Sequence, residues 1–326
     1  MYLNAACTIS PQVTFDADRL PDALVRADGD RLNAIEPDYT GWIDARAIRR
    51  MSRVIRMGYA SALSALKAAG VQVPDAIITG TAYGCLDDTG IFLSKMIEQY
   101  EEALNPTPFI QSTHNTIGSQ VALFLKAYGY NQTYVHRAFS FENSLTDALM
   151  LTREHPDYHV LVGGVDEMTD VSYTLLKRLG AARRKTLGEG AFYGVVSGTP
   201  QPNSVARIVN VATLFKPVTT ADVEAWIKDF LKQNDLSPGH VDLVLHGGDL
   251  PASLQASELR DFKTLCGEYP TATGFATWLA FTILKRGTLP EAANLARPVK
   301  TILIYNAYFG THHSLILLQA CRSSVL

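Results

Sequence analysis

The chain has 326 residues, of which 47% are hydrophobic and 19% charged, and its formal net charge is −3. This is an ordinary globular composition, and the length suits one large domain or two fused halves. Basic residues form no run longer than the short segment 182–185, so the electrostatic footprint of a nucleic-acid-binding protein is missing.

In the first part of the chain, helical and strand patterns alternate. Asp44 is expected to cap a helix that reaches about Ala69, because apolar residues recur at helical spacing. Residues 75–84 predict a buried strand that enters a glycine loop. A helix is expected from Asp88 or Thr89 to about residue 104, and then an apolar helix that Gly129 ends.

The middle of the chain holds a strand, a sharp turn and a helix, in residues 134–151. Enzymes often place a nucleophile at such an elbow. The helix is expected to run to about Glu154 and to be followed by a central strand at 159–168. A further helix at 172–180 and a strand at 188–198 complete this part.

The polar segment 199–204 is the best candidate for a linker, and the pattern then restarts. Alternating strands and helices argue for an α/β fold made of two halves, 1–200 and a shorter 201–326. In the second half we expect strands at 206–215, 241–249, 300–310 and 314–320, and helices at 220–234 and 273–287.

The cysteines are scattered and form no CxxC pair, which argues against a zinc site or a disulfide framework. The first residues do not resemble a signal peptide. No uncharged apolar run approaches the roughly 18 residues that cross a bilayer. We therefore expect a cytoplasmic protein with no metal, no cofactor and no membrane span. The cysteines are Cys7, Cys85, Cys266 and Cys321.

Seven segments, in order along nearly the whole chain, resemble the β-ketoacyl synthase family. The short GEGAF matches a family signature closely. The other matching segments are GTAYGCLDDTGIFLSKM, PTPFIQSTHNTIGSQVALFLKAYGYN, VLVGGVDEM, VLHGGD, KTLCGEYPTATGF and LIYNAYFGTHHSLIL. The resemblance implies a thiolase-like, five-layered αβαβα fold built from two related halves. Within the family, the chain looks most like the bacterial branch associated with flexirubin, dialkylresorcinol and aryl-polyene pigment clusters.

The resemblance also implies a reaction and partners. Members of the family use a cysteine thiolate to accept an acyl chain, and two histidines to polarise a malonyl thioester. A helix N-terminus favours the thiolate, and each imidazole offers an N–H to a developing enolate oxygen. The expected partners are an acyl carrier protein or acyl-CoA, and either a second copy or an active ketosynthase.

The nucleophile is the first departure from the family pattern, because the elbow contains no cysteine. Counted from the strand, the cysteine position falls at Phe139 or Ala138, and counted from the helix it falls at Phe141 or Glu142. Ser140 is the only hydroxyl in the turn. It either caps the helix, which serine commonly does, or is a reactive serine that needs a base such as His246.

The second departure is Glu268, which stands where the resemblance places the second histidine. An ionised carboxylate accepts hydrogen bonds and repels an enolate. We expect Glu268 to pair with Lys263, with Asp249 as another possible partner of that lysine. His246 keeps the family position of the first histidine. It is either an oxyanion donor or a histidine bonded to the backbone at a strand end.

Smaller departures concern the rim of the site. Only residues 181–187 connect the helix at 172–180 to the GEGAF segment, where family members usually have a longer loop. This basic connection is either a solvated turn, which we favour slightly, or a surface for an acidic carrier. The pair His312–His313 belongs to the closing hairpin and lacks metal-like spacing. Cys85 and Cys266 are expected to be buried and not catalytic.

These patterns favour a ketosynthase-like protein that no longer condenses, a partner or pseudo-enzyme similar to a chain length factor in pigment polyketide assembly. The alternative is an active acyltransferase or decarboxylase that acts on carrier-protein or CoA thioesters through Ser140 or His246. An α/β-hydrolase is excluded because no G-x-S-x-G elbow is present. A Rossmann dehydrogenase is excluded because no G-x-G-x-x-G follows a strand.

Overall fold

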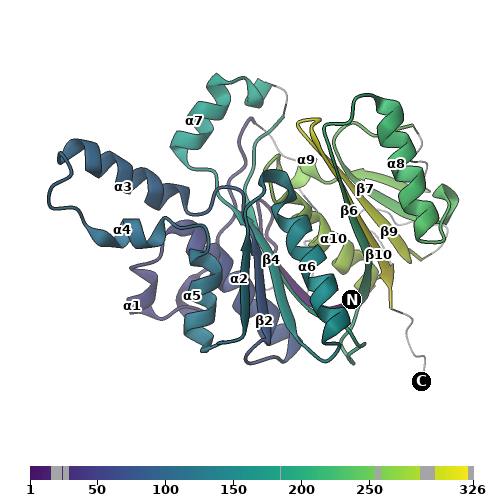
Figure 1. Cartoon of the computed structure of the whole chain (residues 1–326), viewed down its shortest axis with the longest axis horizontal. Coiled ribbons are helices and arrows are strands. Elements are labelled where there is room, and N and C mark those ends of the chain that lie inside the picture. The colour runs from purple at the N-terminus through teal and green to yellow at the C-terminus, as the bar shows by residue number, and fades with distance from the viewer. Residues whose placement is uncertain are drawn as a thin grey trace.

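A computed structural model of the chain describes residues 1–15, 24, 29–183, 185–252, 254, 258–286 and 298–321. Within these residues ten strands join in the order β3-β2-β4-β5-β1-β6-β10-β9-β7-β8 (Figure 1). The strands are β1 Tyr2–Ile9, β2 Ala76–Gly80, β3 Tyr130–Tyr134, β4 Val160–Asp166, β5 Gly190–Ser197, β6 Ala206–Phe215, β7 Leu243–Gly247, β8 Glu258–Asp261, β9 Thr301–Tyr308 and β10 His312–Ala320.

Two groups of five strands repeat one arrangement. In β1–β5 the first strand lies innermost and the third lies at the outer edge, and β6–β10 follow the same order. The groups meet where Tyr2 and Leu3 of β1 pair antiparallel with Arg207 and Ala206 of β6. The division into halves 1–200 and 201–326 remains a prediction, and this repetition supports it.

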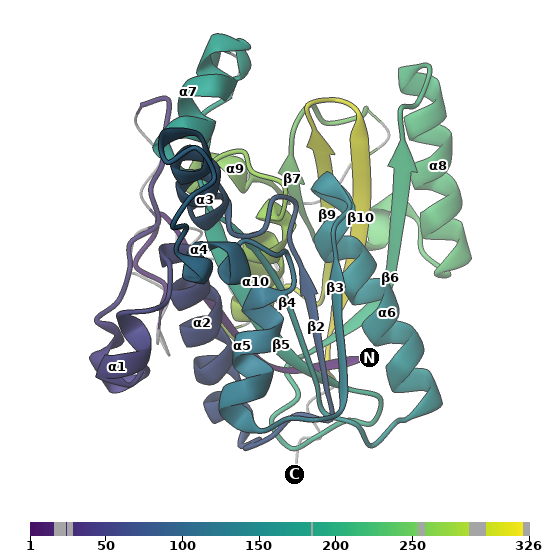
Figure 2. The ribbon, with the colours of Figure 1, turned by 60° about the vertical axis from the view of Figure 1, so that its left-hand side comes forward.

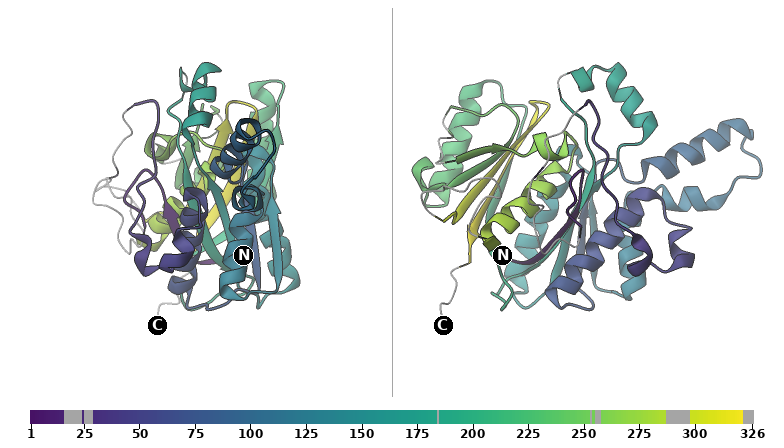
Figure 3. Two further views of the ribbon diagram at one scale, coloured as in Figure 1. Left: turned by 90° about the vertical axis from the view of Figure 1, so that its left-hand side faces the viewer. Right: turned by 180° about the vertical axis from the view of Figure 1, so that it is seen from behind.

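The layers are those of a thiolase-like αβαβα fold, as the sequence predicts. Helices α2 and α5 cover the outer face of the first strand group, and α8 covers that of the second. Helices α6 and α10 lie between the two groups and contact both (Figures 2 and 3). The helices are α1 Ala45–Ile48, α2 Arg53–Ala69, α3 Leu86–Glu98, α4 Pro106–Gln111, α5 Thr116–Leu125, α6 Ser140–Glu154, α7 Asp170–Arg178, α8 Thr220–Gln233, α9 Lys263–Cys266 and α10 Ala272–Arg286.

The central position of α10 explains its sequence. Every residue from Ala272 to Leu284 is buried, whereas a surface helix keeps one polar face. The hydroxyl groups of Thr277 and Thr282 donate to carbonyl groups one turn back, and that of Thr273 donates to Glu142. A helix without an exposed polar face is thus accommodated between the two strand groups.

Several predicted helix boundaries differ from the structure, and α3 also ends at Glu98, before the expected residue 104. The helix expected from Asp44 to Ala69 is two helices, because Asp44 caps the one-turn α1 and a new helix, α2, starts after Ser52. Helix α3 starts at Leu86, ahead of the expected Asp88 or Thr89. Helix α5 ends before the expected Gly129, because Lys126 adopts the left-handed conformation that stops a helix.

The sequence patterns did not predict β1, although this strand lies in the middle of the sheet. Its polar residues interrupt the apolar run: the Asn4 side chain donates to Ser197 Oγ, and the Thr8 hydroxyl donates to the carbonyl of Ala191. These partners lie about two hundred residues away.

Among the described helices, none is both long and apolar enough to span a membrane.

Candidate functional site

The predicted elbow is present, and close backbone packing positions it. Strand β3 ends at Tyr134, a 3₁₀ turn covers Arg137–Phe139, and α6 begins at Ser140. Gly80 at the end of β2 allows this approach, because a Cβ there would lie 2.5 Å from the Ser140 carbonyl oxygen. Arg137 has φ of 50°, a left-handed conformation that is costly for a residue with a side chain. The turn is therefore tight.

Ser140 is buried in this turn, and its hydroxyl is fully used. Its Oγ donates to the Arg137 carbonyl at 2.7 Å and accepts from the His136 N–H at 2.8 Å. The prediction that Ser140 caps the helix is wrong, since Phe139 is the N-cap and the hydroxyl points back to the turn. A nucleophilic serine needs a general base that removes its proton. In the described residues no basic side chain is hydrogen-bonded to this hydroxyl.

Two phenylalanine rings close the elbow. Phe139 is 4% exposed, and its ring centroid lies 4.8 Å from that of His312 and 6.4 Å from that of Phe215. Phe141 is fully buried and packs on Phe192, with 5.3 Å between ring centroids. Any register of the expected cysteine therefore places a buried side chain where the resemblance implies an accessible thiolate.

Glu142, in the first turn of α6, is a fully buried carboxyl group. Its Oε1 accepts hydrogen bonds from Thr273 at 2.9 Å and from Ser314 at 2.7 Å. Burial raises its pKa from 4.5 to about 7, although these bonds and the charge of Lys263 oppose the shift. Its Oε2 and both amide atoms of the buried Asn306, which pairs with Ser314 across the β9–β10 ladder, have no partner in the described residues.

The expected ion pair between Lys263 and Glu268 is formed. Lys263 Nζ lies 2.6 Å from Glu268 Oε1, and the two side chains are 7% and 1% exposed. Burial raises the pKa of Glu268, and the nearby lysine counteracts this. The other expected partner, Asp249, is exposed. A buried acid and base thus neutralise each other, which leaves no free charge here.

The short connection 181–187 packs directly onto Glu268. The Glu268 N–H donates to the Thr186 carbonyl at 2.7 Å, and the Gly188 N–H donates to the Glu268 carbonyl at 3.0 Å. Gly188 and Gly267 must both be glycine, because a Cβ on either would fall within 3 Å of the opposite backbone. Thr186 and Gly188 thus hold Glu268 in place from this end of the connection.

His246 lies at the end of β7, half-buried, with Nδ1 3.1 Å from the Gly248 carbonyl oxygen. This contact requires a proton on Nδ1, so a neutral ring offers only an acceptor at Nε2. The geometry matches the backbone-bonded alternative and not a neutral oxyanion donor. In the described residues no hydrogen bond or ion pair joins His246 to Ser140, Lys263 or Glu268.

The remaining candidates are structural. His312 packs on Phe139, and His313 bonds to the Tyr305 hydroxyl at 3.0 Å, both in the hairpin of β9 and β10. In the described part of the chain no cluster of three or more histidine, cysteine or acidic residues could hold a metal. Burial raises the thiol pKa of Cys85 and of Cys266, so both stay protonated and unreactive at neutral pH.

Sequence reasoning named Glu142 only as a possible position of the nucleophile and missed its partners. Thr273 and Ser314 are 131 and 172 residues away along the chain, and no local pattern connects them. One signal in the sequence pointed to these partners: Glu142 lies in the first turn of a predicted helix and has apolar neighbours such as Phe141. Such a residue needs partners when it is buried.

Comparisons with known proteins agree with this geometry. Residues 28–186 match the family model "Beta-ketoacyl synthase, N-terminal domain". A search of curated protein sequences finds no significant match.

Solved structures match over the full length. "The ishigamide ketosynthase/chain length factor" is 16% identical, with a TM-score of 0.73, and the match covers 98% of this chain and 99% of that one. "AntDE:AntF (apo): type II PKS acyl-carrier protein in complex with its ketosynthase bound to the hexaketide" is 11% identical, with the same coverage and a TM-score of 0.76. "Ketosynthase (ApeO) in Complex with its Chain Length Factor (ApeC) from Xenorhabdus doucetiae" is 15% identical, with 98% of each chain covered and a TM-score of 0.68. The chain therefore has the fold of ketosynthases and chain length factors.

Proposed function

We propose that this protein is a condensation-inactive, ketosynthase-like subunit of polyketide or fatty acid assembly, with a role like that of a chain length factor. One observation carries the proposal: the elbow holds buried Phe139 and a fully hydrogen-bonded Ser140 in place of an accessible thiolate. The Lys263–Glu268 ion pair supports it, because a paired carboxylate cannot donate to an enolate.

An uncovered sheet edge indicates where a partner subunit binds. β3 is the last strand on its side and pairs only with β2 within the described chain. Large apolar side chains beside this edge are exposed, including Leu123 at 68%, Tyr128 at 88% and Tyr130 at 42%. Native proteins seldom leave such an edge uncovered, and an apolar patch of this kind is typical of an interface.

The partner we propose is a cysteine-bearing ketosynthase, with which an acyl carrier protein also associates. Two of the similar structures are named as a ketosynthase with its chain length factor, and one as a ketosynthase with its carrier protein. We propose pigment polyketide assembly as the pathway, because the sequence resembles the bacterial branch associated with pigment clusters. The basic connection at 181–187 offers a surface for an acidic carrier.

Co-purification with a cysteine-bearing ketosynthase, sought among the products of the neighbouring genes, tests this function. We expect a stable heterodimer that elongates carrier-bound acyl chains, whereas the chain by itself forms no covalent acyl adduct and elongates nothing. Leu123→Arg should abolish the heterodimer, because it buries an unpaired charge at the edge. Val218→Arg, at a 92%-exposed site just before α8, the helix that covers the other strand group, should not.

Mass spectrometry of the isolated chain after incubation with acyl carrier protein decides the other possibility. A stable acyl adduct on Ser140, lost in Ser140→Ala, would replace this proposal with an active acyltransferase. Elongation by the isolated chain would do the same.

A further inference from the structure

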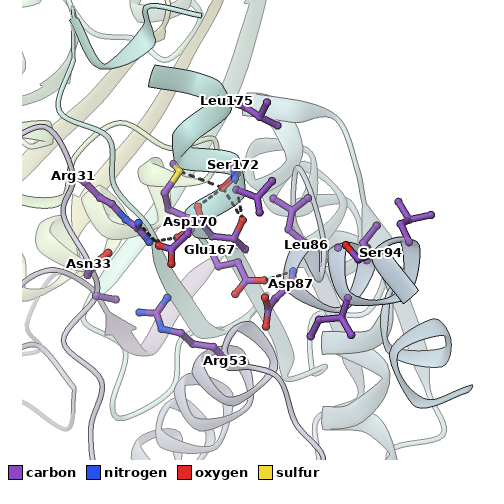
Figure 4. A pocket seen from close by; sticks show the side chains of 18 of the residues that line it. Arg31, Asn33, Arg53, Leu86, Asp87, Ser94, Glu167, Asp170, Ser172 and Leu175 are labelled. Carbon is purple, nitrogen blue, oxygen red and sulfur yellow. Dashed lines mark hydrogen bonds and ion pairs between the residues drawn. The ribbon is translucent and has the colours of Figure 1, made fainter. Parts of the chain in front are cut away.

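Helix α7 forms one wall of a groove of about 980 Å³, and α3 forms another wall. The residues that α7 contributes to this wall include Asp170, Val171 and Leu175, and Figure 4 shows the groove from close by. None of the elbow residues 137–142 lines it. The position of α7 therefore sets the width of a groove that is separate from the elbow.

Apolar packing contributes little to holding α7 in place. No residue of α7 is buried, and its Val171 and Leu175 are 69% and 54% exposed. Among the described helices and strands, α7 packs closely only against the 3₁₀ turn Ala181–Arg183 that follows it. It projects beyond the ends of the strands (Figures 1 and 2). Most helices in proteins are stabilised by packing of an apolar face, so α7 depends on other contacts.

Two ion pairs hold α7, one near each end. Arg31 Nη1 donates to the carboxylate of Asp170, the first residue of the helix, at 2.6 Å. Lys177 Nζ, in the last turn, donates to Asp30 at 2.8 Å and to the Tyr173 hydroxyl at 3.1 Å. The Arg31 guanidinium and Lys177 Nζ also lie 5.1 and 5.3 Å from the centroid of the Tyr173 ring. We call these five residues the α7 latch.

The segment that carries the other half of the latch is fixed to the rest of the fold. The N–H of Leu187, which is 1% exposed, donates to the Asp30 carbonyl at 2.9 Å, and the Leu32 N–H donates to the Leu187 carbonyl at 2.8 Å. The Ala34 N–H donates to the buried carboxylate of Glu189 at 2.8 Å. This segment is therefore a stationary anchor, and α7 is the side of the latch that can move.

The ion pairs of the latch are open to solvent. The side chains of Arg31 and Asp170 are 22% and 95% exposed, and those of Lys177 and Asp30 are 56% and 46% exposed. Exposed ion pairs contribute little to stability, and salt screens them. Regions with few buried apolar contacts open at a lower free energy than the whole fold does. Release of α7 should therefore be much easier than global unfolding.

The chain around α7 is built like a pair of hinges. After the helix, Gly180 has φ of 85°, a conformation that glycine adopts freely, and it is surrounded by open space. Before the helix, the Met168 N–H donates to Glu189 at 2.9 Å and fixes the chain. The Thr169 side chain caps the helix by accepting from the Ser172 N–H. The helix can thus rotate as one unit about these two points.

We infer that α7 is a lid on the groove between α3 and α7, held closed by the α7 latch and released without unfolding of the rest of the protein. High ionic strength, or loss of an ion pair of the latch, opens the lid and widens the groove. This inference goes beyond the proposed function and does not depend on it.

Distances between spin labels on the full chain test the lid. The labels are attached to Leu175→Cys in α7 and Met150→Cys in α6, two sites that are 54% and 58% exposed. A control pair joins Met150→Cys to Leu123→Cys in α5, which packs on α2, β2 and β3. Both pairs carry Cys321→Ser, because the other three cysteines are buried. Electron double resonance compares about 0.1 M with about 1 M salt, between which the Debye length falls from about 10 Å to about 3 Å.

Three variants separate the latch from other exposed charges. Asp30→Lys places a second ammonium group opposite Lys177, so the open fraction in the Met150–Leu175 distances should rise roughly threefold to tenfold. High salt should have a smaller effect in the same direction on the wild type. Asp30→Lys combined with Lys177→Asp restores an ion pair and should close the lid again. Glu98→Lys, which breaks the exposed pair with Lys95 inside α3, should leave these distances unchanged.

The inference is wrong if neither high salt nor Asp30→Lys changes the Met150–Leu175 distances, because contacts other than the latch would then fix α7. An equal change in the Met150–Leu123 control would also overturn it, since the whole fold would be loosened. The midpoint of thermal unfolding of Asp30→Lys should stay within about 2–4 °C of the wild type. A much larger fall would mean that α7 opens only when the protein unfolds. No partner subunit is present, so these results leave the proposed function untouched.

Discussion

The elbow region and the groove between helices α3 and α7 both contain a buried carboxyl group with one oxygen that lacks a partner in the described residues, but only the elbow is closed over it. At the elbow, Glu268 is paired with Lys263 and Glu142 is bonded to two hydroxyl groups. In the groove, one oxygen of Glu167 has no partner among the described residues. The first region is closed by aromatic rings, whereas the second opens to solvent between two helices.

The two regions therefore differ in access to solvent and in the ion pair that the elbow region contains. A buried ion pair and hydrogen-bonded carboxyl groups stabilise a packed interior only when every partner is present. Solvent can reach the second carboxyl oxygen of Glu167, because it is not among the buried atoms that lack a hydrogen-bond partner. Substitutions that leave buried carboxyl groups without partners should therefore harm the elbow region more than the groove.

The largest effect is expected at the ion pair. Lys263→Met leaves Glu268 buried without its cation and should lower the free energy of unfolding by about 3–5 kcal/mol. Adding Glu268→Gln should restore much of this loss. Glu167→Gln in the groove should not destabilise the protein, because it removes no intramolecular ion pair. Denaturant titrations of all four proteins measure these differences, and equal losses in Lys263→Met and Glu167→Gln would contradict the comparison.

The next effect depends on pH and concerns Glu142. Its pKa is raised from 4.5 to about 7 in the folded state, so the folded protein binds the proton more tightly than the unfolded chain. Stability must then fall as the pH rises from about 4.5 to about 7. Glu142→Gln removes this contribution and should be more stable than the wild type at pH 8, by up to about 3 kcal/mol. The advantage should vanish near pH 4, and a difference that does not change with pH would show that folding does not raise the pKa of Glu142.

The smallest effect is expected at Ser140. Ser140→Ala removes two hydrogen bonds within the elbow and should cost about 1–2 kcal/mol. Thermal unfolding measures the loss, and Ser144→Ala is a suitable control because its hydroxyl makes one similar bond within α6. The activity of the heterodimer should be unchanged in both variants. Loss of acyl transfer in Ser140→Ala, but not in Ser144→Ala, would show that Ser140 is catalytic.

The candidate site could be predicted in part. The Lys263–Glu268 pair was expected because five residues separate them within a segment that resembles a known family. The cap assigned to Ser140 was wrong, because serine at a helix start usually bonds forward and here the tight turn at Arg137 places its acceptor behind it. The groove between α3 and α7 was not predicted, because its lining comes from four separate parts of the chain.

The sequence by itself determined the α/β class, most strands and helices, and the absence of a cysteine at the elbow. These features are local: they follow from the periodicity of apolar residues and from which residue occupies a given position. Tertiary structure alone decided which carboxyl groups are satisfied. Glu142 finds partners for its Oε1 131 and 172 residues away, whereas its Oε2 has none within the described chain. Burial and hydrogen bonding are set by distant segments that only the folded sheet brings together.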